Sequence, residues 1–284
     1  MKKQILVPVD LSDLSRIGVE TAIHISKKID AEVNLLHIIE EEKPEGISVT
    51  ADTELNHKAQ SERERFIVQL IKKRQADLEN YLRTIDLKGL TVKTLMEVGD
   101  FTDCMTIATK ENDIDMIVMG TTGEESVSEF FSGNHAEQTS RETGIPVLSV
   151  KSSDNFKEHG SIGFIINLNK PNEELVKMVR NLTNLTKLDL VIFHSKDDDD
   201  PSNKVLLSDL EQICGKYGLS PKRIIIMDTN EDFIDEVQAA ISDFNVKIIA
   251  KSVKKQSGLS RLFLEDVTEE LINDFSEASL IITR

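Results

Sequence analysis

Three glycines and an asparagine in residues 120–134 have the spacing expected of a loop that binds an anion through its backbone N–H groups. They follow the pattern Gly120-x2-Gly123-x9-Gly133-Asn134. A glycine at a strand end lets the backbone turn tightly, and a second one nearby leaves amide N–H groups unobstructed by side chains. A glycine at the start of a helix adds free N–H groups and the positive end of the helix dipole. The spacing predicts a phosphate site, with Asn134 as a helix cap or a phosphate donor.

The carboxylate of Asp10 is a second candidate group, because it directly follows the apolar run of residues 4–9. Asp10, Ser12 and Asp13 are also candidate caps for the helix that follows, and capping is compatible with ligand contact. We find no nucleophile paired with a base, and the motifs GxSxG, GKS/T and GxGxxG are absent from the sequence. The histidines show no metal-ligand spacing. The sequence therefore predicts neither catalytic residues nor a metal site.

The glycine pattern lies between two apolar runs. Residues 114–119 and 145–150 read as strands, and residues 134–142 read as an amphipathic helix between them. Two strands joined through a helix lie parallel in one sheet with a right-handed crossover. Ligands of such sheets bind beyond the carboxyl ends of the strands, where the loop from Gly120 begins.

The remaining elements of the first half continue this alternation. Apolar runs predict strands over residues 4–9, 32–39 and 90–98, and periodic patterns predict helices over residues 14–29, 57–84 and 101–110. Residues 40–56 are polar and read as a loop. The order β-α-β-α-β-α-β-α-β predicts a doubly wound α/β domain.

The pattern restarts after residue 160. Strands are expected at 162–166, 188–193, 223–227, 246–250 and 280–283, and helices at 171–185, 203–217, 232–244 and 262–275. Overlaying the halves pairs residues 5–10 with 162–167 and residues 117–120 with 247–250. We interpret the chain as an internal duplication with domains at 1–151 and 161–284 and a linker at 152–160.

Composition narrows the classes of partner. The 284 residues include 34 Lys and Arg against 50 Asp and Glu, a formal net charge of −16. A field of that sign repels nucleic acid and anionic lipid, so neither is an expected partner. No apolar stretch approaches the roughly 20 residues of a membrane span, and Pro8 and Asp10 interrupt any signal-peptide core. Cys104 and Cys214 form no CxxC and are expected to be reduced and buried. We expect a cytoplasmic protein.

The glycine pattern, the opening VPVDLS with Asp10 and the closing PVLSV strand resemble the universal stress protein family. Because the duplication covers nearly the whole chain, the resemblance is to its tandem-domain members. It implies two five-stranded parallel sheets of order 3-2-1-4-5, of the adenine nucleotide alpha hydrolase-like kind. It also implies ATP across the switch point between strands one and four. Asp10 would meet the ribose or adenine and Ile38 would line the adenine pocket, while Gly120, Gly123, Gly133 and Asn134 would take the phosphates.

Two features depart from the family pattern. Asn134 stands where the family has Ser or Thr. In addition, Glu124, Glu125 and Glu129 lie in a loop that has no Lys or Arg between Gly120 and Gly133. A charge-assisted hydrogen bond contributes about 1.5–3 kcal/mol, so this loop is expected to attract phosphate less strongly. Mg²⁺ would partly offset the loss.

The second half lacks the residues that would hold a nucleotide. Ala250, Val253 and Glu265 stand at the positions of the three glycines, and Asn167 stands at that of Asp10. A Cβ atom at each glycine position obstructs the backbone amides, and Glu265 places a carboxylate where phosphate would sit. The second domain is interpreted as a degenerate scaffold.

Two hypotheses follow. In the first, the protein is a stress-response binding module whose amino-terminal domain binds ATP, with slow or no turnover because nothing positions a base to activate water. In the second, both sites are degenerate and the folded pair serves as an interaction scaffold. By the resemblance, the final strands of the halves pair edge to edge, which leaves other surfaces for a homodimer.

The first hypothesis predicts the effect of a double substitution. Gly120→Val with Gly133→Glu copies the chemistry of the second half, and it is expected to abolish ATP binding while leaving the fold intact. Calorimetric titration with ATP measures this, and an unchanged affinity would contradict the site assignment.

Overall fold

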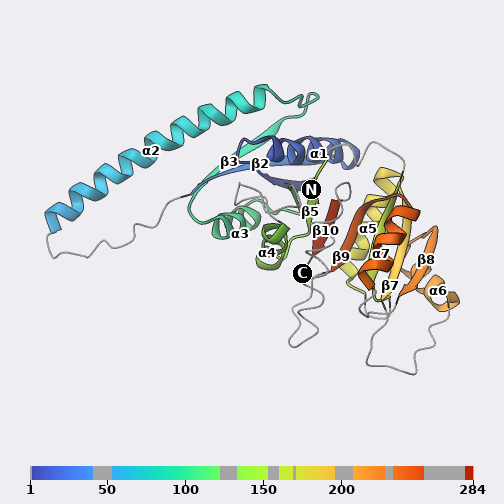
Figure 1. Cartoon of the computed structure of the whole chain (residues 1–284). Coiled ribbons are helices and arrows are strands. Elements are labelled where there is room, and N and C mark those ends of the chain that lie inside the picture. Colours follow the sequence, from blue (N-terminus) through green and yellow to red (C-terminus); the bar gives the residue numbers. More distant parts are fainter. Residues whose placement is uncertain are drawn as a thin grey trace.

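The computed structural model of the chain describes residues 2–40, 53–121, 133–152, 160–168, 171–195, 207–227, 233–252 and 279–283. Ten strands form one sheet in the order β3-β2-β1-β4-β5-β10-β9-β6-β7-β8, with helices on both faces (Figure 1). Each half contributes five strands in the predicted order, which reads 3-2-1-4-5 within that half. The predicted fold class is confirmed.

The first half alternates strands and helices along its length. Its elements are β1 (Lys3–Pro8), α1 (Asp13–Ile29), β2 (Ala31–Ile39), α2 (Thr53–Arg83), β3 (Val92–Val98), α3 (Phe101–Glu111), β4 (Met116–Gly120), α4 (Gly133–Thr143) and β5 (Val147–Val150). All five strands are parallel within this half.

The second half repeats the arrangement. Its elements are β6 (Ser161–Ile166), α5 (Glu173–Thr186), β7 (Asp189–Ser195), α6 (Leu207–Tyr217), β8 (Arg223–Met227), α7 (Phe233–Asp243), β9 (Val246–Ser252) and β10 (Ser279–Thr283). The helix predicted over residues 262–275 lies outside the described residues. β10 runs parallel to β9 and antiparallel to β5, with Ile281 opposite Leu148.

Alternate strand residues face two helical layers. The layer of α1, α2, α5 and α6 packs on one face of the sheet, where Val7, Val9 and Leu35 meet Leu78 and Tyr81 of α2. The layer of α3, α4 and α7 packs on the other face. This period of two determines which face each strand residue presents. The two cysteines are buried and free, as expected.

Helix α1 and strand β4 approach each other closely through two glycines. A Cβ atom at Gly120 would lie 1.9 Å from the carbonyl oxygen of Leu14, and one at Gly18 would lie 2.9 Å from the amide nitrogen of Gly120. Because both obstacles are backbone atoms, no side-chain movement relieves them. Gly120 is therefore required by packing, and the expectation that Gly120→Val leaves the fold intact is wrong.

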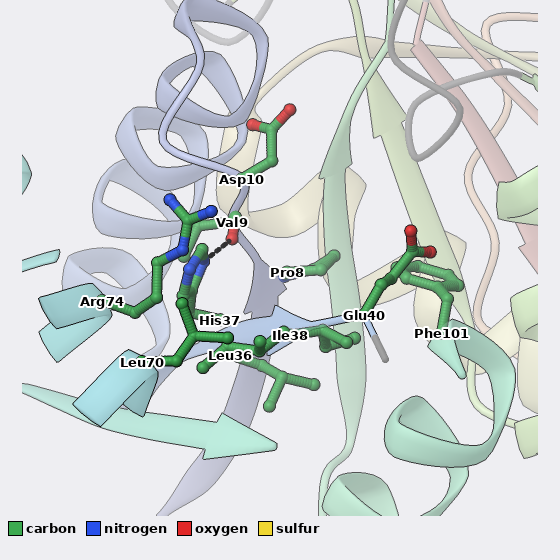
Figure 2. Close-up of a pocket in the computed structure, with 11 residues that line it drawn as sticks. Pro8, Val9, Asp10, Leu36, His37, Ile38, Glu40, Leu70, Arg74 and Phe101 are labelled. Atoms are coloured by element: carbon green, nitrogen blue, oxygen red, sulfur yellow. Dashed lines mark hydrogen bonds between the residues drawn. The ribbon is translucent and has the colours of Figure 1, made fainter. Parts of the chain in front are cut away.

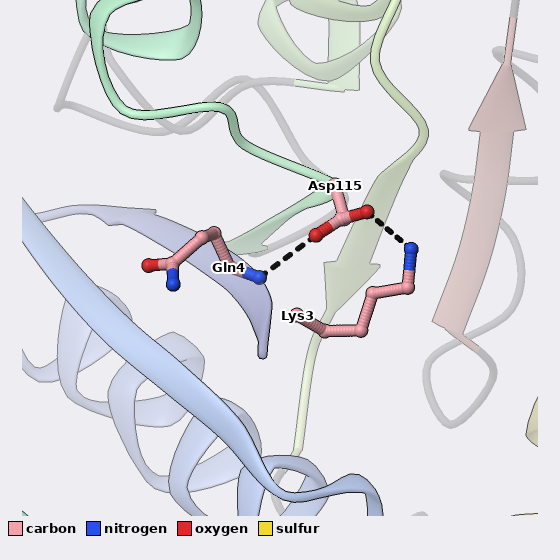
Figure 3. Close-up of polar contacts among 3 residues, drawn as sticks. All are labelled: Lys3, Gln4 and Asp115. Atoms are coloured by element: carbon pink, nitrogen blue, oxygen red, sulfur yellow. Dashed lines mark hydrogen bonds and ion pairs between the residues drawn. The ribbon is translucent and has the colours of Figure 1, made fainter. Parts of the chain in front are cut away.

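The opposite, amino-terminal ends of β1 and β4 are joined through Asp115. Its carboxylate accepts a hydrogen bond from the backbone N–H of Gln4 at 2.9 Å and pairs with the ammonium of Lys3 (Figure 3). The backbone N–H of Asp115 in turn donates to the carbonyl of Gln4 at 2.9 Å. This reciprocal contact fixes where β1 starts beside β4, and so which residues reach the carboxyl edge.

The described helices include none with the length and apolar character needed to cross a bilayer.

The glycine contact predicts a contrast between two alanine substitutions. Gly120→Ala is expected to lower the free energy of unfolding by about 3 kcal/mol or more, because the new methyl group meets the Leu14 carbonyl. Gly215→Ala in α6 is the matched control, since its Cβ would meet nothing within 4 Å. There the loss of glycine's backbone entropy should stabilise the protein by up to about 1 kcal/mol. Denaturant unfolding measures both, and equal effects would contradict the packing role.

Candidate functional site

A pocket of about 290 Å³ lies at the carboxyl ends of β1 and β2 (Figure 2). Helix α2 contributes to one side of it and the start of α3 to the other. The residues that line it are Pro8, Val9, Asp10, Leu36, His37, Ile38, Ile39, Glu40, Leu70, Arg74 and Phe101. Two of the predicted site residues, Asp10 and Ile38, thus lie in one cavity at the edge where ligands of parallel sheets bind.

Proline explains why the sheet opens here. The carbonyl of Gln4 faces β4, where it accepts from Asp115, whereas the amide of Val9 faces β2, where it donates to Leu36. Even-numbered residues of β1 therefore turn their backbone groups toward β4. Pro8 has no N–H to donate on that side, and the β1–β4 register ends at Leu6. The two strands part beyond this point, at the switch point of the sheet.

The carboxylate of Asp10 is held by the turn that leads into α1. One of its oxygens accepts from the backbone N–H of Ser12 at 2.9 Å. Leu11 between them has a left-handed φ of 69°. The cap of α1 is Ser12, whose hydroxyl accepts from the N–H of Ser15, so among the three predicted candidates the capping role falls to Ser12. Asp10 is left with a second carboxylate oxygen for a ligand.

His37 covers the first carbonyl after β1, that of Val9. Its Nδ1 lies 2.7 Å from the carbonyl oxygen of Val9, and because a carbonyl only accepts, Nδ1 must carry the proton. In the neutral ring Nε2 is then an acceptor. Nε2 is buried and has no hydrogen-bond partner among the residues that the structure describes. The sequence alone does not point to this histidine, because its role depends on the strand pairing.

The glycine pattern is described only in part. Gly120 ends β4, where it is fully buried against α1. Gly133 and Asn134 form the first two positions of α4, as the predicted helix start requires. Gly123 and the carboxylates of residues 124, 125 and 129 lie outside the described residues. The predicted phosphate contacts at Gly123, Gly133 and Asn134 stay predictions.

Sequence reasoning also missed the contribution of α2. The sequence predicts an apolar stripe of Phe66, Leu70, Leu78 and Leu82 on this helix. Arg74 falls between Leu70 and Leu78, four residues from each, so it lies on the same face of the helix. Leu70 and Arg74 both line the pocket, while Leu78 is buried in the core. A single positively charged residue within an apolar stripe is the sequence feature that points to this contribution of α2.

A buried hydrogen-bond chain fixes α2 to the turn that holds Asp10. The hydroxyl of Ser15 donates to the carbonyl of Ser12 at 3.0 Å, so it accepts from the hydroxyl of Tyr81 at 3.1 Å. Desolvation by burial raises the pKa of Tyr81 to about 12. The chain links helix α2 to the cap of α1, two residues from Asp10.

The model of the universal stress protein family matches residues 1–151, which is more than half of the sequence. The chain belongs to the universal stress protein family. A universal stress protein of Methanocaldococcus jannaschii is 28% identical over 149 residues, which cover 52% of this chain and 82% of the relative. One of Bacillus subtilis is 27% identical over 155 residues, which cover 53% of this chain and all of the relative.

Solved structures share the fold of both halves. A universal stress protein from Archaeoglobus fulgidus matches with a TM-score of 0.69 and 18% identity, over 99% of this chain and 96% of that one. One from Pseudomonas aeruginosa, described as a putative universal stress protein, matches with a TM-score of 0.62 and 14% identity, over 99% and 93%. At these identities the likeness shows the tandem universal stress protein fold alone.

The equivalent histidine of the second half, His194, accepts a hydrogen bond through Nδ1, whereas His37 donates one. His194 lies opposite Ile166 at the end of β6, as His37 does beside Val9. Its Nδ1 accepts from the backbone N–H of Leu168 at 3.1 Å, so this nitrogen carries no proton. At this strand end, where Asn167 stands in place of Asp10, the histidine thus accepts from a backbone N–H instead of donating to a carbonyl. Among the described residues of both halves, no group of His, Cys, Asp and Glu is placed to hold a metal ion.

Tyr81 supplies a direct measure of the contact between α2 and the site. The protein has two tyrosines and no tryptophan, so Tyr217→Phe leaves Tyr81 as the single tyrosine. Its tyrosinate absorbance should appear with a midpoint near pH 12 in the folded protein, against about 10 after unfolding. Because the folded-state pKa is the higher one, stability should fall as pH rises from 10 to 12, by roughly 2–3 kcal/mol in total.

The variant Tyr81→Phe is the control for that titration. This variant has no ionisable group at position 81. Its free energy of unfolding should therefore not show the fall of roughly 2–3 kcal/mol between pH 10 and 12 that is due to Tyr81. A midpoint near 10 in the folded Tyr217→Phe protein would show that the Tyr81 hydroxyl is not buried against Ser15.

Proposed function

We propose that the amino-terminal half binds an adenine nucleotide, ATP accompanied by Mg²⁺, and that the protein acts as a regulatory module in a stress response. The observation that supports this most is the pocket that brings together Asp10 and Ile38 at the carboxyl ends of β1 and β2. Family membership agrees with it. The nucleotide would come to the edge where Pro8 ends the pairing of β1 with β4.

Each part of the nucleotide has a chemical counterpart. The base would pack on the apolar side chain of Ile38, and the ribose hydroxyls would donate to the carboxylate oxygen of Asp10 that Ser12 leaves unused. The phosphates would take backbone N–H groups at Gly123, Gly133 and Asn134, at the start of α4. Mg²⁺ would offset the carboxylates of residues 124, 125 and 129.

We infer binding rather than catalysis. Fixed amides hold phosphates without activating water, and the imidazole in the pocket, that of His37, already donates its Nδ1 proton to Val9. Turnover of ATP is therefore expected to be slow or absent.

One observation favours the second hypothesis, an interaction scaffold without nucleotide. Gly120 is explained by its contact with Leu14 of α1, so its presence does not itself argue for a phosphate. The case for the nucleotide then rests on the pocket and on the other glycines. The intact Asp10 and Ile38 lead us to prefer the nucleotide.

The assembly and location of the protein are also proposals. We propose that the two halves, whose strands β5 and β10 pair, act as one unit, that further surfaces form a homodimer, and that the protein is cytoplasmic. The domain limits at 1–151 and 161–284 with a linker at 152–160 belong to the same proposal.

The carboxylate of Asp10 gives the cleanest test. Asp10→Asn keeps an amide oxygen to accept from Ser12, so the turn survives, but it removes the charge offered to the ribose. Calorimetric titration with ATP and Mg²⁺ should show one site per wild-type chain and an affinity at least about tenfold lower in Asp10→Asn. Asp13→Asn is the matched control, because Asp13 is exposed in the first turn of α1 and does not line the pocket.

The result separates the two functions. No heat with wild-type protein that carries no nucleotide from purification would reject the nucleotide and leave the scaffold. Equal losses in Asp10→Asn and Asp13→Asn would instead mean that Asp10 acts only through the overall charge.

A further inference from the structure

We propose that Arg74 of α2 recognises the base and ribose end of the bound nucleotide. The inference rests on the proposed function and deepens it, because α2 lies outside the glycine pattern. Among the lining residues that the structure describes, Arg74 carries a positive charge, whereas Asp10 and Glu40 are acidic. The net charge of the chain is −16, and the loop from Gly120 to Gly133 has no Lys or Arg. Arg74 thus brings to the pocket a positive charge that the glycine loop lacks.

The helix presents this side chain to the pocket because of its spacing. Leu78, one turn further along α2, is buried in the core with Val9 and Leu35, which fixes that face of the helix toward the sheet. Arg74 and Leu70 lie on the same face nearer the strand ends. Figure 2 shows them on the side of the pocket where His37 lies, and Phe101 of α3 on the other side.

The guanidinium has donors to offer. Its nearest ion-pair partner described is Asp77, whose carboxylate lies 3.8 Å from Nη1, beyond hydrogen-bond distance, and 45% of the Arg74 side chain is exposed. The group is planar, so it can stack on the face of an aromatic base or donate to its ring nitrogens.

The sheet order places Arg74 at the base rather than the phosphates. The predicted phosphate groups follow β4, whereas the pocket lies over β1 and β2. Strands are about 4.8 Å apart, so β2 and β4 are about 10 Å apart with β1 between them. The cavity of about 290 Å³ is at the small end of ligand pockets, which run from about 300 to 1,000 Å³. A cavity of this size suits the base and sugar end of a nucleotide.

The test compares adenosine with ATP plus Mg²⁺ by calorimetry in wild type, Arg74→Ala, Arg74→Lys and Lys73→Ala. Lys73 is exposed, adjacent on α2 and absent from the pocket lining, so its loss matches the change in charge. We expect Arg74→Ala to weaken adenosine and ATP by the same factor, about 3- to 30-fold. Lys73→Ala should change neither by more than about twofold, and Arg74→Lys should recover only part of the loss.

The outcomes are distinct. If wild type binds ATP and Arg74→Ala behaves like Lys73→Ala, the inference about Arg74 fails while the proposed function stands. If Arg74→Ala weakens ATP but not adenosine, Arg74 meets the phosphates and the assignment to the base is overturned. If wild type binds neither ligand, the proposed function fails and takes this inference with it. Thermal unfolding of each variant confirms that the exposed substitutions leave the fold in place.

Discussion

The backbone contact between α1 and β4 is the constraint on which the first half depends. With the carbonyl of Leu14 where a Cβ of residue 120 would be, the helix lies against the strand at a distance that only glycine allows. That contact fixes the start of α1, and with it the turn from Asp10 to Ser12 at the end of β1. The position of the candidate carboxylate is thus set by packing between glycines that never need to touch a ligand.

Helix α2 is tied to the same turn from the other side. Tyr81 donates to Ser15, and Ser15 donates to the carbonyl of Ser12, so movement of α2 has to change the hydrogen bonds at the cap of α1. Because α2 also carries Leu70 and Arg74 into the pocket, the wall of the site and its carboxylate are held by one network. A ligand that contacts both would bind a largely preformed cavity.

The sequence predicted nearly every element, because buried parallel strands are short apolar runs and their helices keep a period of 3.6. The strand order followed from the family resemblance and not from these patterns. It located Asp10 and Ile38 correctly at strand ends. It could not show that Gly120 serves packing, since a motif does not reveal which helix crosses the strand. It also missed His37 and Arg74, because the first depends on pairing with β1 and the second on where a long helix passes over the sheet.

The comparison of the halves separates what the fold needs from what a ligand needs. Both halves place a histidine at the end of the second strand, and both use its Nδ1 to satisfy a backbone group of the neighbouring strand end. A histidine present in both therefore belongs to the architecture. Asp10 is different. Its counterpart is Asn167, which stands at a strand end where the histidine accepts from a backbone N–H instead of donating to a carbonyl. The two halves therefore share the histidine as part of the fold, whereas the carboxylate of Asp10, and with it the proposed ligand contact, belongs to the first half alone.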